Sequence, residues 1–213
     1  MQSTVEIIEK YKIVVIMRGL DMEQAIRCAK AMYDGGIRLI EVTFDQTKAP
    51  EVTGEIISAL CGEFPDMCIG AGTVVSREQL LCAHKSGAKY IISPNTNPQI
   101  IEETKKLSLV SMPGALTPSE VVAAHEAGAD FVKIFPISAV QKNYIKNISA
   151  PLNNIKLIAV GGVTHENLAE FMHEGAVGIG VGGNIVNKKL IGEGKFGEIT
   201  ELARKYVSAM EEV

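Results

Sequence analysis

The stretch Gly128-Ala129-Asp130-Phe131-Val132-Lys133-Ile134 contains the unit that decides the fold, a glycine followed by a short apolar run with the composition of a β-strand. A helix-like segment precedes the glycine, and glycine readily takes the left-handed conformation in which many helices end. The same helix–glycine–strand unit recurs at Gly36-Ile37-Arg38-Leu39-Ile40, at Gly87-Ala88-Lys89-Tyr90-Ile91 and at Gly175-Ala176-Val177-Gly178-Ile179. The repeat indicates a chain that alternates between helices and strands.

Eight apolar, strand-like runs follow one another along the chain. They are Lys12–Arg18, Leu39–Phe44, Cys68–Val74, Tyr90–Pro94, Leu109–Pro113, Phe131–Pro136, Lys156–Gly161 and Val177–Gly182. Helix-like segments lie between them, such as Met22–Asp34, Arg77–Ser86, Ser119–Ala127 and His165–Glu174, and a closing helix is predicted from Phe196 to about Met210. Strands alternating with helices predict a parallel sheet, and eight is the number that closes a (β/α)8 barrel. An open, doubly wound sheet is the alternative, because any α/β protein contains such turns.

The composition is that of one α/β domain spanning residues 1–213, with 46% apolar residues and no low-complexity tract. The formal net charge of −4 and the lack of a basic stripe predict no nucleic-acid partner. No run reaches the ~20 apolar residues that span a bilayer, and the first residues lack the features of a signal peptide. The cysteines show no C-x-x-C spacing, so the sequence predicts no metal site and reduced thiols in a cytoplasmic protein: Cys28, Cys61, Cys68 and Cys82.

Lys133 interrupts the apolar run at 131–136. Side chains alternate along a strand, so Lys133 shares a face with Phe131 and Phe135. That face is either exposed, which would leave two phenyl rings in water, or directed into the barrel. Burial disfavours the charged ammonium, and a neutral amine at a strand end is what addition to a carbonyl requires. A lysine in a strand is more often a surface residue with its charge in water, and that alternative stays open.

Glu41 interrupts the second run in the same way and shares a face with Leu39 and Thr43. A carboxylate on the inner face would either pair with Lys133 or carry protons. Schiff-base chemistry needs a base for the carbinolamine steps and for proton transfer at the methyl carbon of pyruvate, and a lysine and a glutamate in one pocket meet both needs. A buried structural ion pair is the alternative.

Two glycine pairs, Gly161-Gly162 and Gly182-Gly183, follow the last two predicted strands. In (β/α)8 barrels the loops at these places commonly bind phosphate through backbone N–H groups and the start of a short helix. Glycine lets an anion approach the backbone closely. Two softer candidates end strands on the same rim. Thr73 is placed to hydrogen-bond a substrate carboxylate, and Arg18 is placed to bind an anion. The alternative for Arg18, equally compatible with the sequence, is a surface arginine with no ligand.

These residues together resemble the 2-keto-3-deoxy-6-phosphogluconate / 4-hydroxy-2-oxoglutarate aldolase family, whose members are class I aldolases on a (β/α)8 barrel. The resemblance runs nearly end to end, and in this order and spacing its motifs are highly specific. The motifs are Gly35-Gly36-Ile37, Ile40-Glu41-Val42-Thr43, Gly70-Ala71-Gly72-Thr73-Val74, Ile92-Ser93-Pro94, Met112-Pro113-Gly114, Thr117-Pro118, Lys133-Ile134-Phe135-Pro136, Gly161-Gly162-Val163 and Gly180-Val181-Gly182-Gly183.

The resemblance implies that Lys133 forms a Schiff base with a 2-keto acid and that Glu41 is the general acid and base. It implies that Thr73 and Pro94 line the pyruvyl end, that Phe135 forms a wall, and that the glycine pairs bind a distal phosphate. The implied reaction cleaves a 2-keto-3-deoxy-6-phospho sugar acid to pyruvate and glyceraldehyde 3-phosphate, with 4-hydroxy-2-oxoglutarate, which gives pyruvate and glyoxylate, as a further substrate. Family members are usually homotrimers and use no metal or organic cofactor.

The sequence departs from the family pattern at three places. Many relatives carry an arginine in the loop after the second strand, which holds the substrate carboxylate, whereas this chain reads Phe44-Asp45-Gln46-Thr47 there. Arg18 is the candidate to replace that arginine. Val160 stands where relatives often have threonine before the first glycine pair, and Asn184 where they often have serine after the second. These two changes remove hydroxyl donors from the phosphate site, although Asn184 still offers an amide NH₂.

Two other functions fit the barrel. One is a phosphate-binding isomerase, epimerase or thiamin-phosphate-type synthase, which would share the glycine pairs but needs no lysine inside the sixth strand beside Glu41. The other is a non-catalytic binding barrel, which has no use for a neutral, desolvated amine. The fold alone cannot separate these functions, and Lys133 is the residue that discriminates between them.

Overall fold

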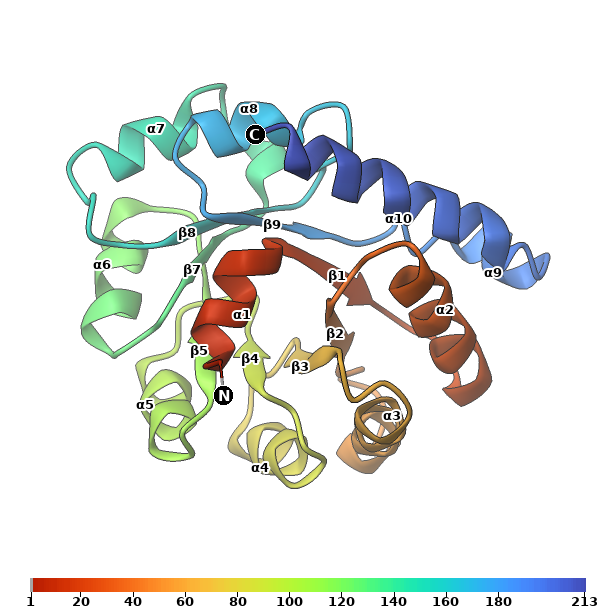
Figure 1. Ribbon diagram of the computed structural model, residues 1–213. Helices are drawn as coiled ribbons and strands as arrows, with labels where there is room; N and C mark the ends of the chain where they lie inside the picture. The colour runs from red at the N-terminus through yellow and green to blue at the C-terminus, as the bar shows by residue number, and fades with distance from the viewer. Residues whose placement is uncertain (1) are drawn as a thin grey trace.

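The computed structural model describes residues 2–213; Met1, the first residue of the domain predicted for 1–213, lies outside the described residues. Parallel strands form one nine-stranded sheet in the order β5-β4-β3-β2-β1-β9-β8-β7-β6. The strands are β1 Ile13–Met17, β2 Leu39–Thr43, β3 Cys68–Gly72, β4 Tyr90–Ile92, β5 Val110–Met112, β6 Gly114–Ala115, β7 Val132–Ile134, β8 Leu157–Val160 and β9 Gly178–Val181. The strands at the two ends of this order are consecutive in the chain, so the sheet curls into a barrel (Figure 1).

The fifth predicted strand is divided in two at Pro113, which is why the structure has nine strands where the sequence predicted eight. Proline has no N–H to donate to a neighbouring strand. Its carbonyl still accepts a hydrogen bond of 2.8 Å from the backbone N–H of Lys133, so the barrel wall continues past the break. The predicted (β/α)8 barrel is thus confirmed, and the open sheet is excluded.

All the α-helices except α1 lie around the outside of the barrel, as Figure 1 shows. The α-helices are α1 Thr4–Tyr11, α2 Met22–Asp34, α3 Pro50–Glu63, α4 Arg77–Lys85, α5 Pro98–Lys106, α6 Pro118–Glu126, α7 Tyr144–Ser149, α8 Leu168–His173, α9 Lys188–Gly192 and α10 Phe196–Glu211. Four glycines between a helix and a strand have positive φ, as the repeat predicted: 95° at Gly36, 93° at Gly87, 98° at Gly128 and 106° at Gly175.

Helix α1 closes the amino end of the barrel and was not predicted. It begins with a capping box. The backbone N–H of Ser3 donates to the Glu6 carboxylate, and the backbone N–H of Glu6 donates to the Ser3 hydroxyl. In Figure 1 the helix lies across the centre of the barrel. Its buried residue Ile8 packs with inward-facing residues of the barrel such as Val14, Leu39 and Phe131. The barrel interior is therefore sealed at this end.

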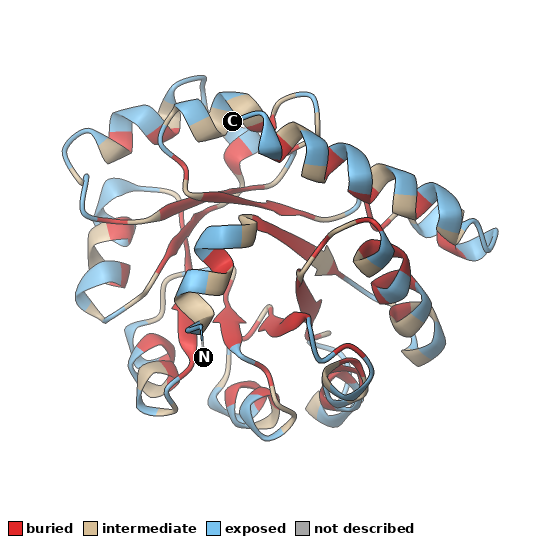
Figure 2. Cartoon of the chain, viewed as in Figure 1, coloured by how far each residue is buried: buried red, intermediate tan, exposed pale blue. Residues whose placement is uncertain are grey.

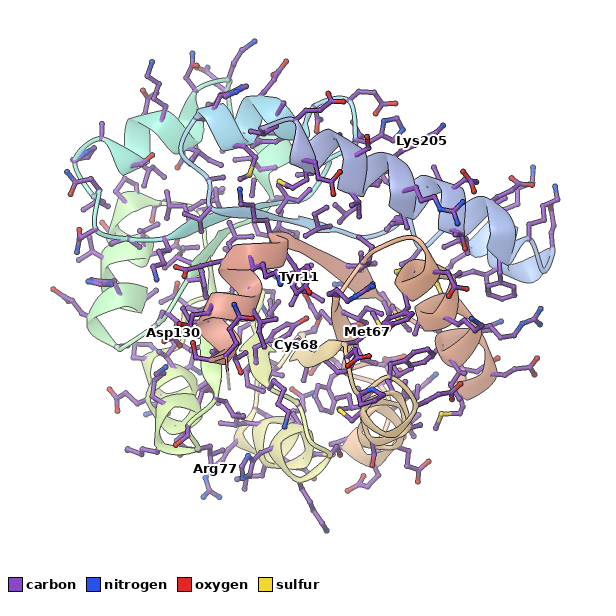
Figure 3. All side chains as sticks on the ribbon, viewed as in Figure 1. Tyr11, Met67, Cys68, Arg77, Asp130 and Lys205 are labelled. Carbon is purple, nitrogen blue, oxygen red and sulfur yellow. The ribbon has the colours of Figure 1, made fainter. Side chains whose placement is uncertain are left out.

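A second, larger core lies between the strands and the outer helices. Figure 2 shows buried residues along the strands and on the inward faces of the helices, with exposed residues outside. Long charged side chains such as Arg77 on α4 and Lys205 on α10 point away from the barrel, whereas Cys68 of β3 belongs to its interior (Figure 3). In residues 2–213 no helix is both long and apolar enough to cross a membrane.

Candidate active site

Lys133 is the central residue of β7, and its side chain points into the barrel. The residue is 6% exposed. It shares the inner face with Phe131, below it, and with Phe135, whose ring centroid lies 4.8 Å from Nζ of Lys133. The inward orientation expected from the alternation of side chains is therefore observed, and the solvent-facing alternative is excluded.

The surroundings of Lys133 lower the pKa of its amine from the usual lysine value. Burial is the largest cause, because it disfavours the ammonium form, and the positive charge of Arg18 acts in the same direction. The negative charge of Glu41 opposes both. A larger fraction of the amine is neutral near pH 7 than in an exposed lysine, and the neutral amine is the nucleophilic form.

Glu41 is the central residue of β2 and is 2% exposed. Its carboxylate is directed toward the carboxyl ends of the strands, because Oε1 occupies the space above Gly72: a Cβ built on Gly72 would lie 1.6 Å from it. Gly72 pairs with Thr43, two residues beyond Glu41 along the inner face. Oε2 of Glu41 has no hydrogen-bond partner in residues 2–213. The carboxylate is thus enclosed, pointed at the mouth of the barrel and partly unsatisfied.

Burial raises the pKa of Glu41 above the usual glutamate value, and the positive charges of Lys133 and Arg18 partly offset the rise. No ion pair joins Glu41 to Lys133 in the part of the chain that the structure describes. The structural ion pair considered from the sequence is therefore not formed. What the structure contains instead is a carboxyl group and an amine with pKa values displaced toward each other, an arrangement typical of proton-transfer sites.

A cavity of about 510 Å³, called here the mouth cavity, opens at the carboxyl ends of β7, β8, β9 and β1. Lys133 and Glu41 do not line it themselves, but Phe135, whose ring lies beside the Lys133 amine, does. The cavity brings together most of the sites predicted from sequence, and its lining includes Arg18, Phe135, Val160, Gly161, Gly162, Gly182, Gly183, Asn184 and Lys188. Val160 is buried and faces inward, against Gly180. The two glycine pairs therefore lie on the same cavity, as a shared phosphate site requires.

The two glycine loops are built to present backbone N–H groups. Gly161 and Gly162 have φ values of 99° and 83°, which favour glycine. The N–H groups of Gly162, Gly183 and Asn184 donate to no acceptor within the described chain. The side-chain amide of Asn184 donates 2.9 Å to the carbonyl of Val163 and so ties the two loops together. The short helix expected here begins at Lys188, and the side chain of Asn187 already accepts from the backbone N–H groups of its first turn.

A second cavity of about 460 Å³ adjoins the first on the side of β1 and β2, and Arg18 and Lys188 line both. Thr73 lies on this second cavity, with a φ of 57° that is unusual for a β-branched residue. The side-chain amide of Gln46 donates 3.0 Å to the Thr73 carbonyl and supports this conformation. Strained backbone of this kind is concentrated at functional sites.

Pro94 lines neither cavity but lies beside the strand pair that carries Lys133. A Cβ built on Gly114 would lie 2.4 Å from the carbonyl oxygen of Pro94, and Gly114 is the register partner of Lys133. All predicted site residues are therefore found at or below the carboxyl ends of the strands, where barrel enzymes carry their active sites.

Two polar residues, one on the rim of this site and one in the barrel interior below it, were not predicted. Lys188 is exposed on the rim of both cavities, with its Nζ 3.3 Å from a Cβ built on Gly19. Its position four residues after Asn184 was a usable signal, because a cation close behind a glycine loop with free backbone N–H groups is a natural anion ligand. Tyr90 is fully buried beside Gly70 inside the barrel. Its neighbours in the sequence are apolar and gave no indication of a functional role. Among residues 2–213, no three His, Cys, Asp or Glu side chains are grouped to hold a metal ion.

Comparison with known proteins gives one family. Residues 4–202 match the family model described as KDPG and KHG aldolase. The chain is 33% identical to 2-dehydro-3-deoxy-6-phosphogalactonate aldolase of Escherichia coli over 83% of this chain and 85% of that protein. It is 30% identical to 2-dehydro-3-deoxy-phosphogluconate aldolase of Treponema pallidum over 94% of each chain.

A solved structure of KDPG aldolase from Legionella pneumophila, with pyruvate captured at low pH as a covalent carbinolamine intermediate, is similar with a TM-score of 0.86. The two sequences are 27% identical, and the match covers 95% of this chain and 97% of that one. The barrel, the inward lysine and the extent of the sequence matches agree: the chain belongs to the KDPG and KHG aldolase family.

Proposed function

We propose that the chain is a class I aldolase that cleaves a 2-keto-3-deoxy-6-phospho sugar acid to pyruvate and glyceraldehyde 3-phosphate. The observation that supports this most is the placement of a buried lysine and a buried glutamate on the inner face of one barrel, beneath a cavity with two glycine loops. An isomerase or a binding barrel would have a use for the loops but none for the desolvated amine of Lys133.

The neutral amine of Lys133 adds to the keto carbon, C2, and forms a carbinolamine that loses water to give an iminium ion. Glu41 then takes the proton of the C4 hydroxyl while the C3–C4 bond breaks, and the electron pair of that bond neutralises the iminium nitrogen to give an enamine. The aldehyde fragment leaves. Glu41 returns its proton to C3, and water hydrolyses the resulting iminium ion, which frees pyruvate and the amine of Lys133.

The environment of each group suits its part in these steps. Lys133 has to lose a proton before it attacks, and burial lowers its pKa. Glu41 has to accept a proton and return it in one turnover, and burial raises its pKa toward the working range of a proton carrier. The carboxylate above Gly72 and the phenyl wall of Phe135 lie on the side of the mouth, where the cleaved bond and the leaving aldehyde would be.

The mouth cavity supports a phosphorylated substrate. A phosphate at the far end would accept from the loop amides of Gly162, Gly183 and Asn184, which have no acceptor within the described chain. Lys188 would supply positive charge from the rim of this cavity. We propose that Arg18 binds the substrate carboxylate in place of the missing arginine, assisted by Thr73. 4-Hydroxy-2-oxoglutarate is proposed as a further substrate.

The galactonate isomer is a second candidate substrate, because a relative at 33% identity has the name 2-dehydro-3-deoxy-6-phosphogalactonate aldolase. The gluconate and galactonate compounds differ in configuration at C4 and give the same two products, so the mechanism above serves either. By family resemblance the active protein is a homotrimer, which light scattering coupled to gel filtration tests.

The test is a panel of substrates with pyruvate release measured by coupled oxidation of NADH. The panel contains the two 6-phospho acids, their unphosphorylated analogues and 4-hydroxy-2-oxoglutarate. We expect kcat/KM to be highest for a 6-phospho acid. Equal or better cleavage of the unphosphorylated acids would show that the phosphate site is vestigial, and no pyruvate release from any of the five would refute the proposed activity.

A further inference from the structure

Tyr90, the first residue of β4, is a buried polar residue that the mechanism above does not use. Its hydroxyl has no hydrogen-bond partner, and among the described residues the only other enclosed side-chain atom in that condition is Oε2 of Glu41. Unpaired buried polar atoms are rare, because each loses its hydration without compensation. Two of them in one barrel interior call for a common explanation.

The strand register brings these two residues face to face. Glu41 is paired with Gly70 on β3, and Ala71 is paired with Ile91, which aligns Gly70 with Tyr90. Tyr90 and Glu41 therefore lie on either side of Gly70, one strand away from it in each direction, and neighbouring strands are about 4.8 Å apart. A Cβ built on Gly70 would lie between 2.1 and 2.4 Å from three carbons of the Tyr90 ring. The ring thus lies flat across Gly70 and extends toward β2.

The carboxylate of Glu41 lies one layer higher, above Gly72. Gly70 and Gly72 are on the same face of β3, roughly 6.6 Å apart along the strand. The phenol over the first glycine and the carboxylate over the second therefore occupy neighbouring layers of the barrel interior, and the negative charge of Glu41 acts on the Tyr90 phenol.

We infer that Tyr90 is a positioning residue for Glu41: its hydroxyl donates, through one enclosed water molecule, to Oε2 and holds the carboxylate above Gly72. The inference rests on the role proposed for Glu41. Enclosed waters commonly satisfy buried polar groups that have no protein partner. A hydrogen bond to an ionised carboxylate stabilises that form, so the link counteracts part of the rise that burial causes in the pKa of Glu41.

The other titratable groups near this pair leave the direction of the effect unchanged. Lys133 and Arg18 face Glu41 from β7 and from the end of β1, and both lower its pKa. Cys68 of β3 faces Tyr90, and burial raises the pKa of its thiol to about 12, so the thiol stays neutral. Burial also raises the pKa of Tyr90 well above the usual tyrosine value. The phenol therefore remains a donor throughout the working range of the enzyme.

The test is Tyr90→Phe, which keeps the ring over Gly70 and removes only the hydroxyl. We expect kcat to fall about tenfold, the effect of losing one hydrogen bond to a charged group, with KM changed little. The acidic limb of the pH profile should move to higher pH, because Glu41 becomes harder to ionise. The matched control is Tyr33→Phe, which removes a hydroxyl bonded to Asp66 at the surface, and we expect it to leave both quantities unchanged.

Two further measurements separate this role from a structural one. In the Glu41→Gln background Tyr90→Phe should cost almost nothing more, because Tyr90 acts through Glu41. A high-resolution crystal structure should show one water within hydrogen-bond distance of both oxygens. A Tyr90→Phe enzyme with normal kcat and an unmoved acidic limb, an equal loss in the Glu41→Gln background, or no bridging water would each overturn the inference. A wild-type enzyme that releases pyruvate would leave the proposed function standing in all three cases.

Discussion

Oε1 of Glu41 occupies the place that a side chain at position 72 would take, 1.6 Å from a Cβ built on Gly72. The position of the carboxylate therefore depends on a residue with no side chain at all. Glycine is needed here for the volume it leaves free, because its φ is not in the positive range. A methyl group at this position has to displace either the carboxylate or the backbone of β3.

Gly72→Ala is therefore expected to impair catalysis in the same way as a substitution of Glu41, because it displaces the Glu41 carboxylate. General acid–base assistance is typically worth about 10²–10⁴-fold, and we expect kcat losses in that range for both Gly72→Ala and Glu41→Gln, with pyruvate still trapped slowly on Lys133. Gly62→Ala is the control, because Gly62 lies in α3 and a Cβ there meets nothing within 4 Å. That change should leave kcat unaltered and stabilise the helix by up to about 1 kcal/mol. A fully active Gly72→Ala or Glu41→Gln enzyme would remove Glu41 from the mechanism.

Lys133 is expected to carry the covalent intermediate. Pyruvate plus borohydride should reduce the Schiff base to a stable adduct on Lys133, found by mass spectrometry of a digest. Lys133→Ala should abolish turnover and trapping, and so should Lys133→Arg, since the guanidinium does not lose its proton in proteins. Lys30→Arg, at an exposed lysine paired with Asp34 on α2, should behave as wild type. An adduct on another lysine would refute the assignment.

Arg18 is expected to set the acidic limb of the pH profile. Its charge lowers the pKa of both Lys133 and Glu41. Activity requires the neutral amine and the ionised carboxylate, so it is lost as the pH falls through these pKa values. Arg18→Gln should raise the pKa values of both Lys133 and Glu41, so the acidic limb of kcat/KM should move to higher pH. KM for the keto acid should increase as well, because a proposed ligand of its carboxylate is lost. Arg27→Gln, on the exposed face of α2, should move neither. An unchanged limb in Arg18→Gln would place Arg18 outside the site.

Lys188 is expected to discriminate between phosphorylated and unphosphorylated substrates. Lys188→Gln should raise KM for the 6-phospho acid by roughly tenfold, because that factor corresponds to the loss of one charge-assisted hydrogen bond. KM for the unphosphorylated acid should change far less. The neighbouring lysine provides the control, because Lys189 is exposed and lines neither cavity. Equal effects of Lys188→Gln on both substrates would assign the lysine to the carboxylate end instead.

Much of the barrel could be predicted because its units are local. A glycine with positive φ between a helix and a strand is a property of a few neighbouring residues, and all four predicted examples are observed. The inward direction of Lys133 followed from the two phenylalanines beside it. The division of the fifth strand at Pro113 was harder to predict from the sequence, because a proline is also found at the end of a strand and Pro113 ended the predicted one. Helix α1 had a readable signal in the capping box from Ser3 to Glu6.

The pairs that make the site were harder to predict because they join distant parts of the chain. The fit of Glu41 over Gly72, and of Tyr90 over Gly70, depends on the register of three strands, which no single stretch of sequence contains. The same is true of Lys188, which reaches the rim beside Gly19 from the opposite end of the chain. Sequence patterns indicated which residues face inward but not which of them fill one another's space.

Because α1 and Ile8 close the amino end of the barrel, the site is reached from the carboxyl ends of the strands, where the two cavities open. In the proposed reaction the pyruvyl fragment is held on Lys133 at the bottom, and the phosphorylated aldehyde lies between it and the exit. Cleavage must then release the aldehyde first and pyruvate second. Synthesis must run in the reverse order, with pyruvate seated before the aldehyde enters. An excess of the aldehyde phosphate would occupy the opening ahead of pyruvate, so condensation should slow as its concentration rises.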